Sequence, residues 1–377
     1  MQIRKTKAVY NLIRWYAKGE GNKEKLYKGI QKKTIHLKNQ NPERPKVKVY
    51  CYYPSKKPLG GYLLTPGLHP LGADHPKIED FSLMLASLGY IVYNPHMKDY
   101  SDLHIVKETL TDYFTVFDAF TKNPRLPAKA RKINIFSISF GCIMALRLAS
   151  NKKRAAQVGA VIIFGGFGSW QSTCDAIMNN IFPKTEKAKS SDIRSVPAIY
   201  NHLIEFLPAI NEEGKIRIRK AWLSYMQKTW MNDSYISRDK CLELANEMAC
   251  KFYGQEKTTF LLGLGAHKDC LKVYKKSIHA DSYEHLNPLH RTQEIVCSVY
   301  LIHGKHDELI PAEQQSIIKE GLPPKVIKRA FLTKLYGHSE KNIKSSAFAK
   351  IFSNISEIKN IIRIILTLSV PKTNKLR

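Results

Sequence analysis

From residue 47 onward, short strand-like runs alternate with helical patterns, and this rhythm constrains the fold more than any other feature of the chain. The runs are rich in β-branched and aromatic residues, and several are apolar throughout, as buried parallel strands are. They are VKVYCYYP, GYLLTPG, YIVYNP, KINIFSIS, AVIIFGGF, SVYLIHG and RAFLTKLYG, with helical patterns such as IEDFSLMLASLG and CIMALRLASN between them. This alternation predicts the α/β class, with a mostly parallel central sheet flanked by helices.

The rhythm stops after Trp170 and resumes at about Cys297. The residues between them show only helical and loop patterns, which predicts a helical lid or cap inserted between two strands. A long insertion of this kind adds little closure entropy. The expected organisation is a basic N-terminal extension (1–46), an α/β core (47–170 and 287–370), the helical insertion (171–286) and a basic tail (371–377).

The chain is strongly basic, with 60 Lys and Arg against 32 Asp and Glu and a net charge of +28. The excess is concentrated at the ends, since residues 1–49 hold 14 Lys and Arg against 3 Glu. Such a charge favours anionic membranes, nucleic acid or acidic substrates. No basic motif of a nucleic-acid-binding fold is present, which disfavours nucleic acid. Peripheral contact with an anionic membrane and a merely solvated basic surface remain the two interpretations of the charge.

Targeting and metal signals are missing from the sequence. Seven cysteines are scattered without CxxC spacing, which indicates reduced thiols. There is no signal-peptide pattern and no run of 18 apolar residues. We therefore expect a cytoplasmic protein, at most peripheral to a membrane. The spacing of Val9, Leu12, Ile13 and Tyr16 predicts a basic helix, either docked on the body or lying at a membrane. The histidines suggest no metal site, we expect no cofactor, and the oligomeric state is left open.

Three polar residues follow three separate predicted strands: Ser139, Asp307 and His338. In open α/β sheets, reactive groups gather at this edge. Ser139 needs an adjacent base to attack at neutral pH, and His338 can take the proton and later deliver it to the leaving group. Asp307 would hold the imidazole tautomer and stabilise the imidazolium. Taken singly, each residue has an ordinary structural interpretation: Ser139 as a helix cap, Asp307 as a turn residue and His338 as a surface histidine. Together they favour catalysis.

A strand-to-helix turn that carries a nucleophile needs small residues two positions before and after it, here Ser137 and Gly141. It also needs an oxyanion hole. One N–H is expected from Phe140, at the start of the next helix. The second is expected from the loop after GYLLTPG, with Leu68 as first choice and His69 as second.

These segments resemble the α/β-hydrolase superfamily. The matching pieces are TPGLHPLGADHP, SLGYIVYNP, FSISFG, HGKHDELIP and LYGHS, within residues 47 to about 370. The order Ser, Asp, His is the order of that family's triad. Ser137 departs from the family's usual glycine. The resemblance is closest to small esterases and to dienelactone-hydrolase-like or acyl-peptidase-like enzymes. It implies hydrolysis through an acyl-enzyme without metal or cofactor.

The leading hypothesis is a serine hydrolase that cleaves a carboxylic ester, such as a lipid-like acyl ester, beneath the helical insertion. The same triad would serve an acyltransferase, in which an alcohol or amine replaces water. It would also serve a peptidase or amidase. A non-enzymatic scaffold that binds a partner or a membrane through its basic ends is the alternative from another class.

Overall fold

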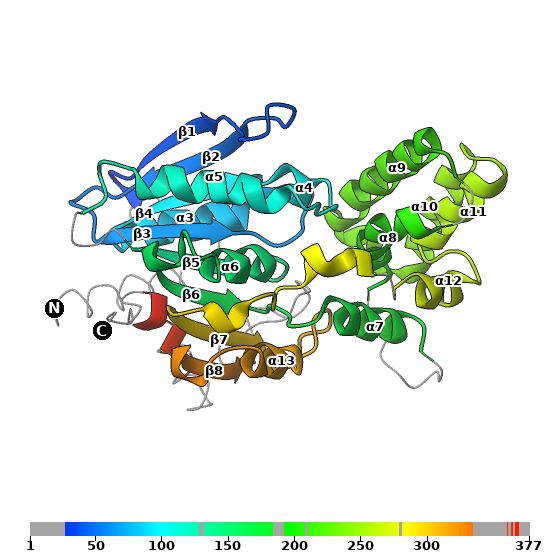
Figure 1. The fold of residues 1–377 in the computed structure, drawn as a ribbon. Coiled ribbons are helices and arrows are strands. Elements are labelled where there is room, and N and C mark those ends of the chain that lie inside the picture. Colours follow the sequence, from blue (N-terminus) through cyan, green and yellow to red (C-terminus); the bar gives the residue numbers. More distant parts are fainter. Residues whose placement is uncertain are drawn as a thin grey trace.

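The computed structural model describes residues 27–127, 132–183, 192–207, 210–278 and 281–334, together with 360, 363–364 and 366–368. At its centre lies an eight-stranded sheet (Figure 1) in the order β1-β2-β4-β3-β5-β6-β7-β8. Pairs β1–β2 and β2–β4 are antiparallel, and all the others are parallel. The predicted α/β class with a mostly parallel sheet is therefore confirmed. The strands are β1 (Gln31–Leu37), β2 (Val47–Tyr53), β3 (Gly60–Thr65), β4 (Tyr90–His96), β5 (Ile133–Ile138), β6 (Val158–Phe164), β7 (Ser298–Gly304) and β8 (Ile327–Thr333).

Seven of these strands coincide with predicted runs, and β7 matches SVYLIHG residue for residue. The strand that sequence analysis does not predict is β1, which pairs with β2 along its whole length from Gln31 to Leu37. It is an edge strand, mostly exposed, and carries Lys32 and Lys33. Lysines are a common protection of sheet edges, and an exposed edge needs no apolar run. The sheet thus begins inside the range assigned from sequence to the N-terminal extension.

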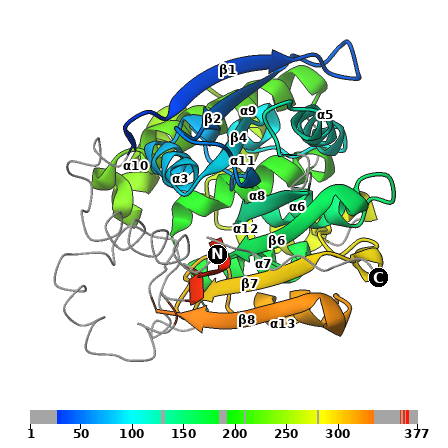
Figure 2. The same cartoon turned by 90° about the vertical axis from the view of Figure 1, so that its left-hand side faces the viewer.

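Helices cover both faces of the sheet, as Figure 2 shows with α3 on one side and α5 and α6 on the other. Side chains of one strand alternate between the two cores: Leu63 of β3 packs with α5 and α6, whereas Tyr62 and Leu64 pack with α3. Both faces are apolar because both are buried, which explains the continuous apolar runs in the sequence. The helices beside the sheet are α3 (Pro76–Ser87), α4 (Lys98–Ser101), α5 (Thr109–Thr121), α6 (Gly141–Ala149) and α13 (Gln314–Glu320).

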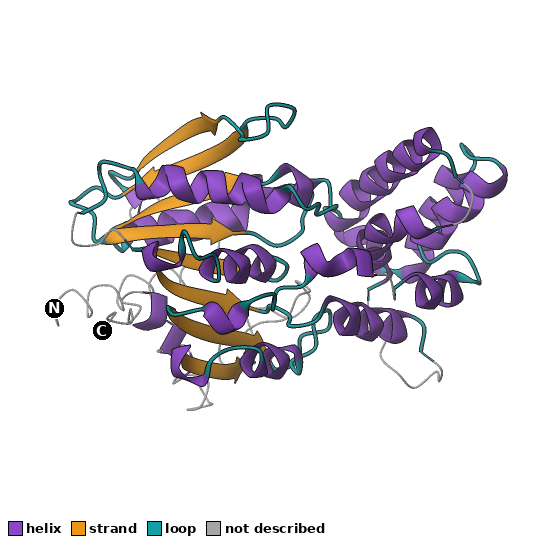
Figure 3. Cartoon of the chain, in the orientation of Figure 1, coloured by secondary structure: helices purple, strands orange, loops and turns teal. Residues whose placement is uncertain are grey.

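Between β6 and β7 the described chain is helical, as predicted, and these helices stand beyond the strand ends (Figures 1 and 3). Their core contains the fully buried Tyr200, Trp222, Tyr225 and Phe260. They are α7 (Trp170–Ile181), α8 (Val196–Leu203), α9 (Glu212–Trp230), α10 (Arg238–Ala249), α11 (Gly254–Gly263) and α12 (Cys270–Ser277). Short 3₁₀ turns occur at Gly72–Asp74, Ala155–Gln157, Ile193–Ser195, Ile204–Phe206, Asp233–Ile236, Asp281–Leu286, Thr292–Glu294 and Pro324–Val326.

Near the C-terminus, the described residues 360, 363–364 and 366–368 pack against the sheet. They are helical, and Leu368 is buried in the core on the α3 face. The Tyr62 hydroxyl of β3 donates a hydrogen bond to the Leu368 carbonyl at 2.7 Å. The Asn360 side-chain amide donates to the Leu332 carbonyl of β8 at 3.1 Å. The predicted N-terminal helix around Val9 to Tyr16 lies outside the described residues.

Within the described ranges, no helix is both long enough and apolar enough to cross a bilayer.

Candidate active site

Ser139 occupies a sharp turn between β5 and α6, with a backbone φ of +52°. A non-glycine residue rarely adopts this conformation, which costs about 1–2 kcal/mol per residue. Two hydrogen bonds hold the turn. The Ser139 N–H donates to the Phe164 carbonyl at the end of β6 at 2.9 Å. The Cys142 N–H donates to the Ser139 carbonyl at 3.1 Å and starts the first turn of α6. The strain therefore falls on the residue predicted to be the nucleophile.

The turn is pressed against the end of β3. A Cβ atom added to Gly141 would lie 2.2 Å from the Thr65 carbonyl oxygen and 3.0 Å from the Pro66 oxygen. A Cβ atom added to Gly67 would lie 3.2 Å from Ser139 Cβ and 3.8 Å from Ser139 Oγ. Ser137 is fully buried, and its Oγ has no hydrogen-bond partner within the described part of the chain. The loop after β3 thus lies directly against Ser139.

Phe140 follows Ser139 and immediately precedes α6, so its N–H lies at the helix N-terminus. Its carbonyl accepts a hydrogen bond from the Tyr100 hydroxyl at 2.9 Å, and Tyr100 is fully buried. The bond ties the turn to α4 across 40 positions of sequence. Tyr100 is a positioning residue that sequence analysis missed, because a lone tyrosine in a short polar helix gives no signal of its contacts.

Leu68 and His69 lie in the loop after β3, directly after Gly67. Leu68 is partly buried and packs against the main core. The His69 Nδ1 accepts a hydrogen bond from the Leu71 N–H at 3.1 Å. The His69 ring packs edge-on against His75, with centroids 4.6 Å apart, and lies 5.9 Å from the ring of Trp230 of α9. The β3 loop is therefore in contact with the helices between β6 and β7.

Asp307 follows β7, and its side chain is fully buried. Its Oδ1 accepts hydrogen bonds from the N–H groups of Leu309 and Ile310, at 3.0 and 2.9 Å. His303 is also buried, and its Nε2 donates to the Ile310 carbonyl at 2.9 Å. The distance from His303 Nε2 to Asp307 Oδ2 is 3.7 Å. His303 thus holds the HGKHDELIP loop in shape.

The parallel strands bring these residues to one edge of the sheet. Strand β5 lies between β3 and β6, and β7 follows β6. Ser139 and Asp307 therefore follow strands that are two positions apart, or about 10 Å at ordinary strand spacing. An imidazole between them spans such a gap. Residues 335–359 lie outside the described residues, and His338 is among them. The complete triad remains a prediction.

The segment between β6 and β7 forms hydrogen bonds with the loop that follows α4. The Asn201 side-chain amide donates to the carbonyls of Asp102 and Leu103, at 3.1 Å each. The Ile105 N–H donates to His202 Nε2 at 3.0 Å, and the Ile105 carbonyl accepts from His285 Nε2 at 3.1 Å. We call His202 and His285 the histidine clamp. Sequence analysis did not identify it.

The histidine clamp requires a neutral His202. Its Nδ1 donates to the Ala198 carbonyl at 2.8 Å, so its Nε2 must carry a lone pair to accept from Ile105. Burial, followed by the neighbouring His104, holds the pKa of His202 well below its usual range. Burial, followed by the charge of Arg219, lowers the pKa of His104 to about 4. The Trp170 ring lies between this cluster and the turn, 5.1 Å from the His202 ring and 5.7 Å from the Phe140 ring.

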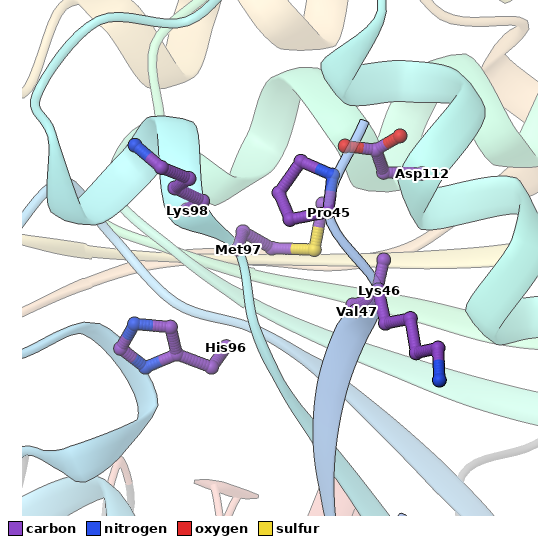
Figure 4. Close-up of a pocket in the computed structure, with 7 residues that line it drawn as sticks. All are labelled: Pro45, Lys46, Val47, His96, Met97, Lys98 and Asp112. Carbon is purple, nitrogen blue, oxygen red and sulfur yellow. The ribbon is translucent and has the colours of Figure 1, made fainter. Parts of the chain in front are cut away.

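The small pocket of Figure 4, between β2, α4 and α5, has a volume of about 20 Å³, enough for one water molecule. It is lined by Pro45, Lys46, Val47, His96, Met97, Lys98 and Asp112. Within the described ranges, no group of three or more His, Cys, Asp or Glu side chains is arranged to hold a metal ion.

No family model and no curated protein sequence matches this chain. Its structure resembles that of an acylaminoacyl peptidase from Pyrococcus horikoshii, with a TM-score of 0.50 and 12% identity. The match covers 93% of this chain and 43% of the peptidase, so the chain spans less than half the length of that protein. This match, together with the parallel sheet and the strained turn after β5, decides the fold. The chain has the α/β-hydrolase fold.

Two further solved structures, an esterase and an α/β hydrolase, are less similar to this chain. An esterase from Pyrococcus furiosus gives a TM-score of 0.48 at 12% identity, over 92% of this chain and 95% of the esterase. An α/β hydrolase from Penicillium gives 0.44 at 15% identity, over 89% and 99%. At such low identity, structural similarity concerns the fold alone. The chemistry of this α/β-hydrolase fold must therefore be argued from its own residues.

Proposed function

We propose that this protein is a serine hydrolase that cleaves a carboxylic ester through an acyl-enzyme on Ser139. The observation that carries the proposal is the strained φ of +52° at Ser139, with Gly141 pressed on the backbone of β3. A helix cap does not require either feature, because the usual cap residue has extended backbone angles. Strained residues that persist in a fold concentrate at functional sites.

In the proposed reaction, Ser139 Oγ attacks the ester carbonyl carbon as His338 takes the hydroxyl proton. The oxyanion that forms is stabilised by the N–H of Phe140, and by that of Leu68 or His69. The carbonyl then re-forms, the ester C–O bond breaks, and His338 returns the proton to the departing alcohol. Water, deprotonated by His338, attacks the acyl-enzyme and releases the carboxylic acid and free Ser139. Asp307 orients the imidazole of His338 and stabilises the positive charge that the ring carries once it has taken the proton.

The buried position of Ser139 supports a covering role for the helices between β6 and β7. Ser139 has 6% of its surface exposed, and Trp170 and Trp230 of these helices reach Phe140 and His69. We therefore propose that α7 to α12 form a lid that limits access to the site. Exclusion of water strengthens the electrostatic stabilisation of an oxyanion.

Amide hydrolysis and acyl transfer use the same groups. The acylaminoacyl peptidase similarity makes a peptidase or amidase the main alternative, although it concerns the fold alone. A series of p-nitrophenyl esters of rising chain length, set against matching p-nitroanilides, separates the two. Faster turnover of the esters supports the proposal. Turnover of an acylated amino-acid anilide alone would replace it with the peptidase alternative.

The decisive experiment is labelling with a fluorophosphonate, which reacts with activated serines, followed by intact-mass measurement. Wild-type protein should gain one adduct. Ser139→Ala should gain none and should lose ester hydrolysis by about 10⁴-fold or more. The fold should survive, because removal of the Ser139 side chain leaves the turn's backbone bonds in place.

Ser137→Ala is the matched control. This neighbouring serine is also buried, and its hydroxyl has no partner in the described structure. The variant should be labelled at the wild-type rate. An adduct on Ser139→Ala, its loss in Ser137→Ala, or no adduct on wild-type protein would each overturn the assignment of Ser139.

A further inference from the structure

A second site candidate lies near the end of the sheet opposite the helices α8 to α12. It is an open groove of about 320 Å³ between the edge of the sheet and the C-terminal end of α5. It is lined by Lys33, Ile35, Leu37, Tyr53, Tyr93, Ala119, Lys122, Asn123, Pro124 and Arg125. We call it the β1–α5 groove. In Figure 1, α5 runs from α4 to the end of the sheet that is remote from α8 to α12. None of the described residues of the candidate active site lines the groove.

The charge of the groove has one sign. Lys33, Lys122 and Arg125 are exposed cations, and the lining contains no Asp or Glu. No ion pair to a carboxylate is recorded for any of the three among the described residues. Neighbouring Lys32, by contrast, pairs with Glu79 at 2.6 Å. Three cations without carboxylate partners around one depression favour an anionic occupant.

The floor of the groove is apolar and held in place. Ile35, Leu37 and Tyr53 are partly buried and pack against the main core. The Asn123 side-chain amide donates to the hydroxyls of Tyr93 and Tyr53, at 2.9 and 3.3 Å. The Arg125 guanidinium lies over the Tyr53 ring, 4.5 Å from its centroid. A stacked guanidinium is pre-organised and keeps donors for an oxyanion such as phosphate.

The shape of the groove favours a ligand that belongs to a larger surface over a small ligand that the protein would enclose. The groove is open to solvent, which suits a headgroup whose remainder is held elsewhere. The chain's net charge of +28 adds long-range attraction to an anionic surface. We propose that the β1–α5 groove binds the phosphate-bearing headgroup of an anionic phospholipid in a membrane surface.

The test is flotation of the full chain with vesicles of phosphatidylcholine, with and without phosphatidylglycerol. Wild-type protein should bind only the vesicles with phosphatidylglycerol, and added salt should weaken the binding. The triple variant Lys33→Gln, Lys122→Gln, Arg125→Gln should bind about 100-fold more weakly, as expected for three cations near an anionic surface.

The matched control removes the same charge elsewhere. Lys272, Lys275 and Lys276 are exposed on α12, and their triple change to Gln should alter affinity by less than about threefold. Both triple variants should keep the wild-type unfolding transition and fluorophosphonate labelling. Retention of labelling separates this inference from the proposed hydrolase function.

Three results would overturn the proposal. One is equal weakening in both triple variants, which would show a diffuse charge effect. Another is the absence of groove-dependent vesicle binding, either because the groove variant binds as well as wild type or because wild-type protein does not bind. The third concerns the source of the phosphate: groove-dependent binding of soluble glycerol phosphate by calorimetry, without vesicle binding, would assign the groove to a free metabolite.

Discussion

At the scale of single residues, the most informative positions are those where the backbone is strained or where two segments touch too closely for a larger side chain. Ser139 has a strained φ, and Gly141 and Gly67 lie where the β3 loop and the turn touch. The sequence spacing of Ser137, Ser139 and Gly141 predicts such a turn. It cannot predict Tyr100, because the bond from Tyr100 to the Phe140 carbonyl joins two segments that no local pattern connects.

Asp307 offers a test that separates loop structure from catalysis. In Asp307→Asn, the amide oxygen can still accept from the N–H groups of Leu309 and Ile310, so the free energy of unfolding should change little. The amide group no longer carries the charge that stabilises a protonated imidazole. Ester hydrolysis should therefore fall by about 10⁴-fold.

Asp307→Ala serves as the comparison, because it removes both acceptor bonds and should also lower the free energy of unfolding by about 1–3 kcal/mol. Initial rates of ester hydrolysis and urea unfolding measure the two effects. Wild-type hydrolysis by Asp307→Asn would exclude Asp307 as the triad acid.

At the scale of elements, the contact between the helices and the sheet domain depends on neutral histidines. Burial is the largest cause of the lowered pKa of His104 and His202, the two histidines at this contact. The unfolded chain therefore binds more protons than the folded chain once the pH falls below about 6.5, the ordinary histidine value. The contribution of these groups to stability is complete above pH 6.5 and is lost progressively toward pH 4.

His104 carries a defined part of this pH dependence, since its pKa is about 4. Urea unfolding of wild-type protein should show a free energy that falls between pH 6.5 and 4. His104→Gln should reduce that fall by roughly 3 kcal/mol. His36→Gln, at an exposed position of β1, is the control and should leave the slope unchanged. Parallel curves for wild type and His104→Gln would contradict the role of this histidine.

At the scale of the whole molecule, the described C-terminal residues complete the core on the α3 face of the sheet. Leu368 is 3% exposed and packs with Tyr62, Phe136 and Ile162 on the α3 face. Leu368→Ala should lower the free energy of unfolding by about 2–5 kcal/mol through lost burial and a residual cavity. Thermal and urea unfolding measure the change.

Leu332→Ala provides the comparison, because Leu332 of β8 is 40% exposed. This substitution should lower the free energy of unfolding by less than about 1 kcal/mol. A cost at position 368 no larger than that at position 332 would show that the described C-terminal residues add nothing to the core.

The sequence by itself determined the class of the fold, seven of its eight strands and the small residues around Ser139. These features are local: buried parallel strands need apolar runs, and a sharp turn needs small neighbours. Tertiary structure alone decided the rest. The edge strand β1 depends on pairing with β2, the histidine clamp joins Ile105 to a residue 97 positions away, and the β1–α5 groove joins strands to the end of a helix. Such contacts depend on how the elements pack against one another, so no periodicity along the chain predicts them.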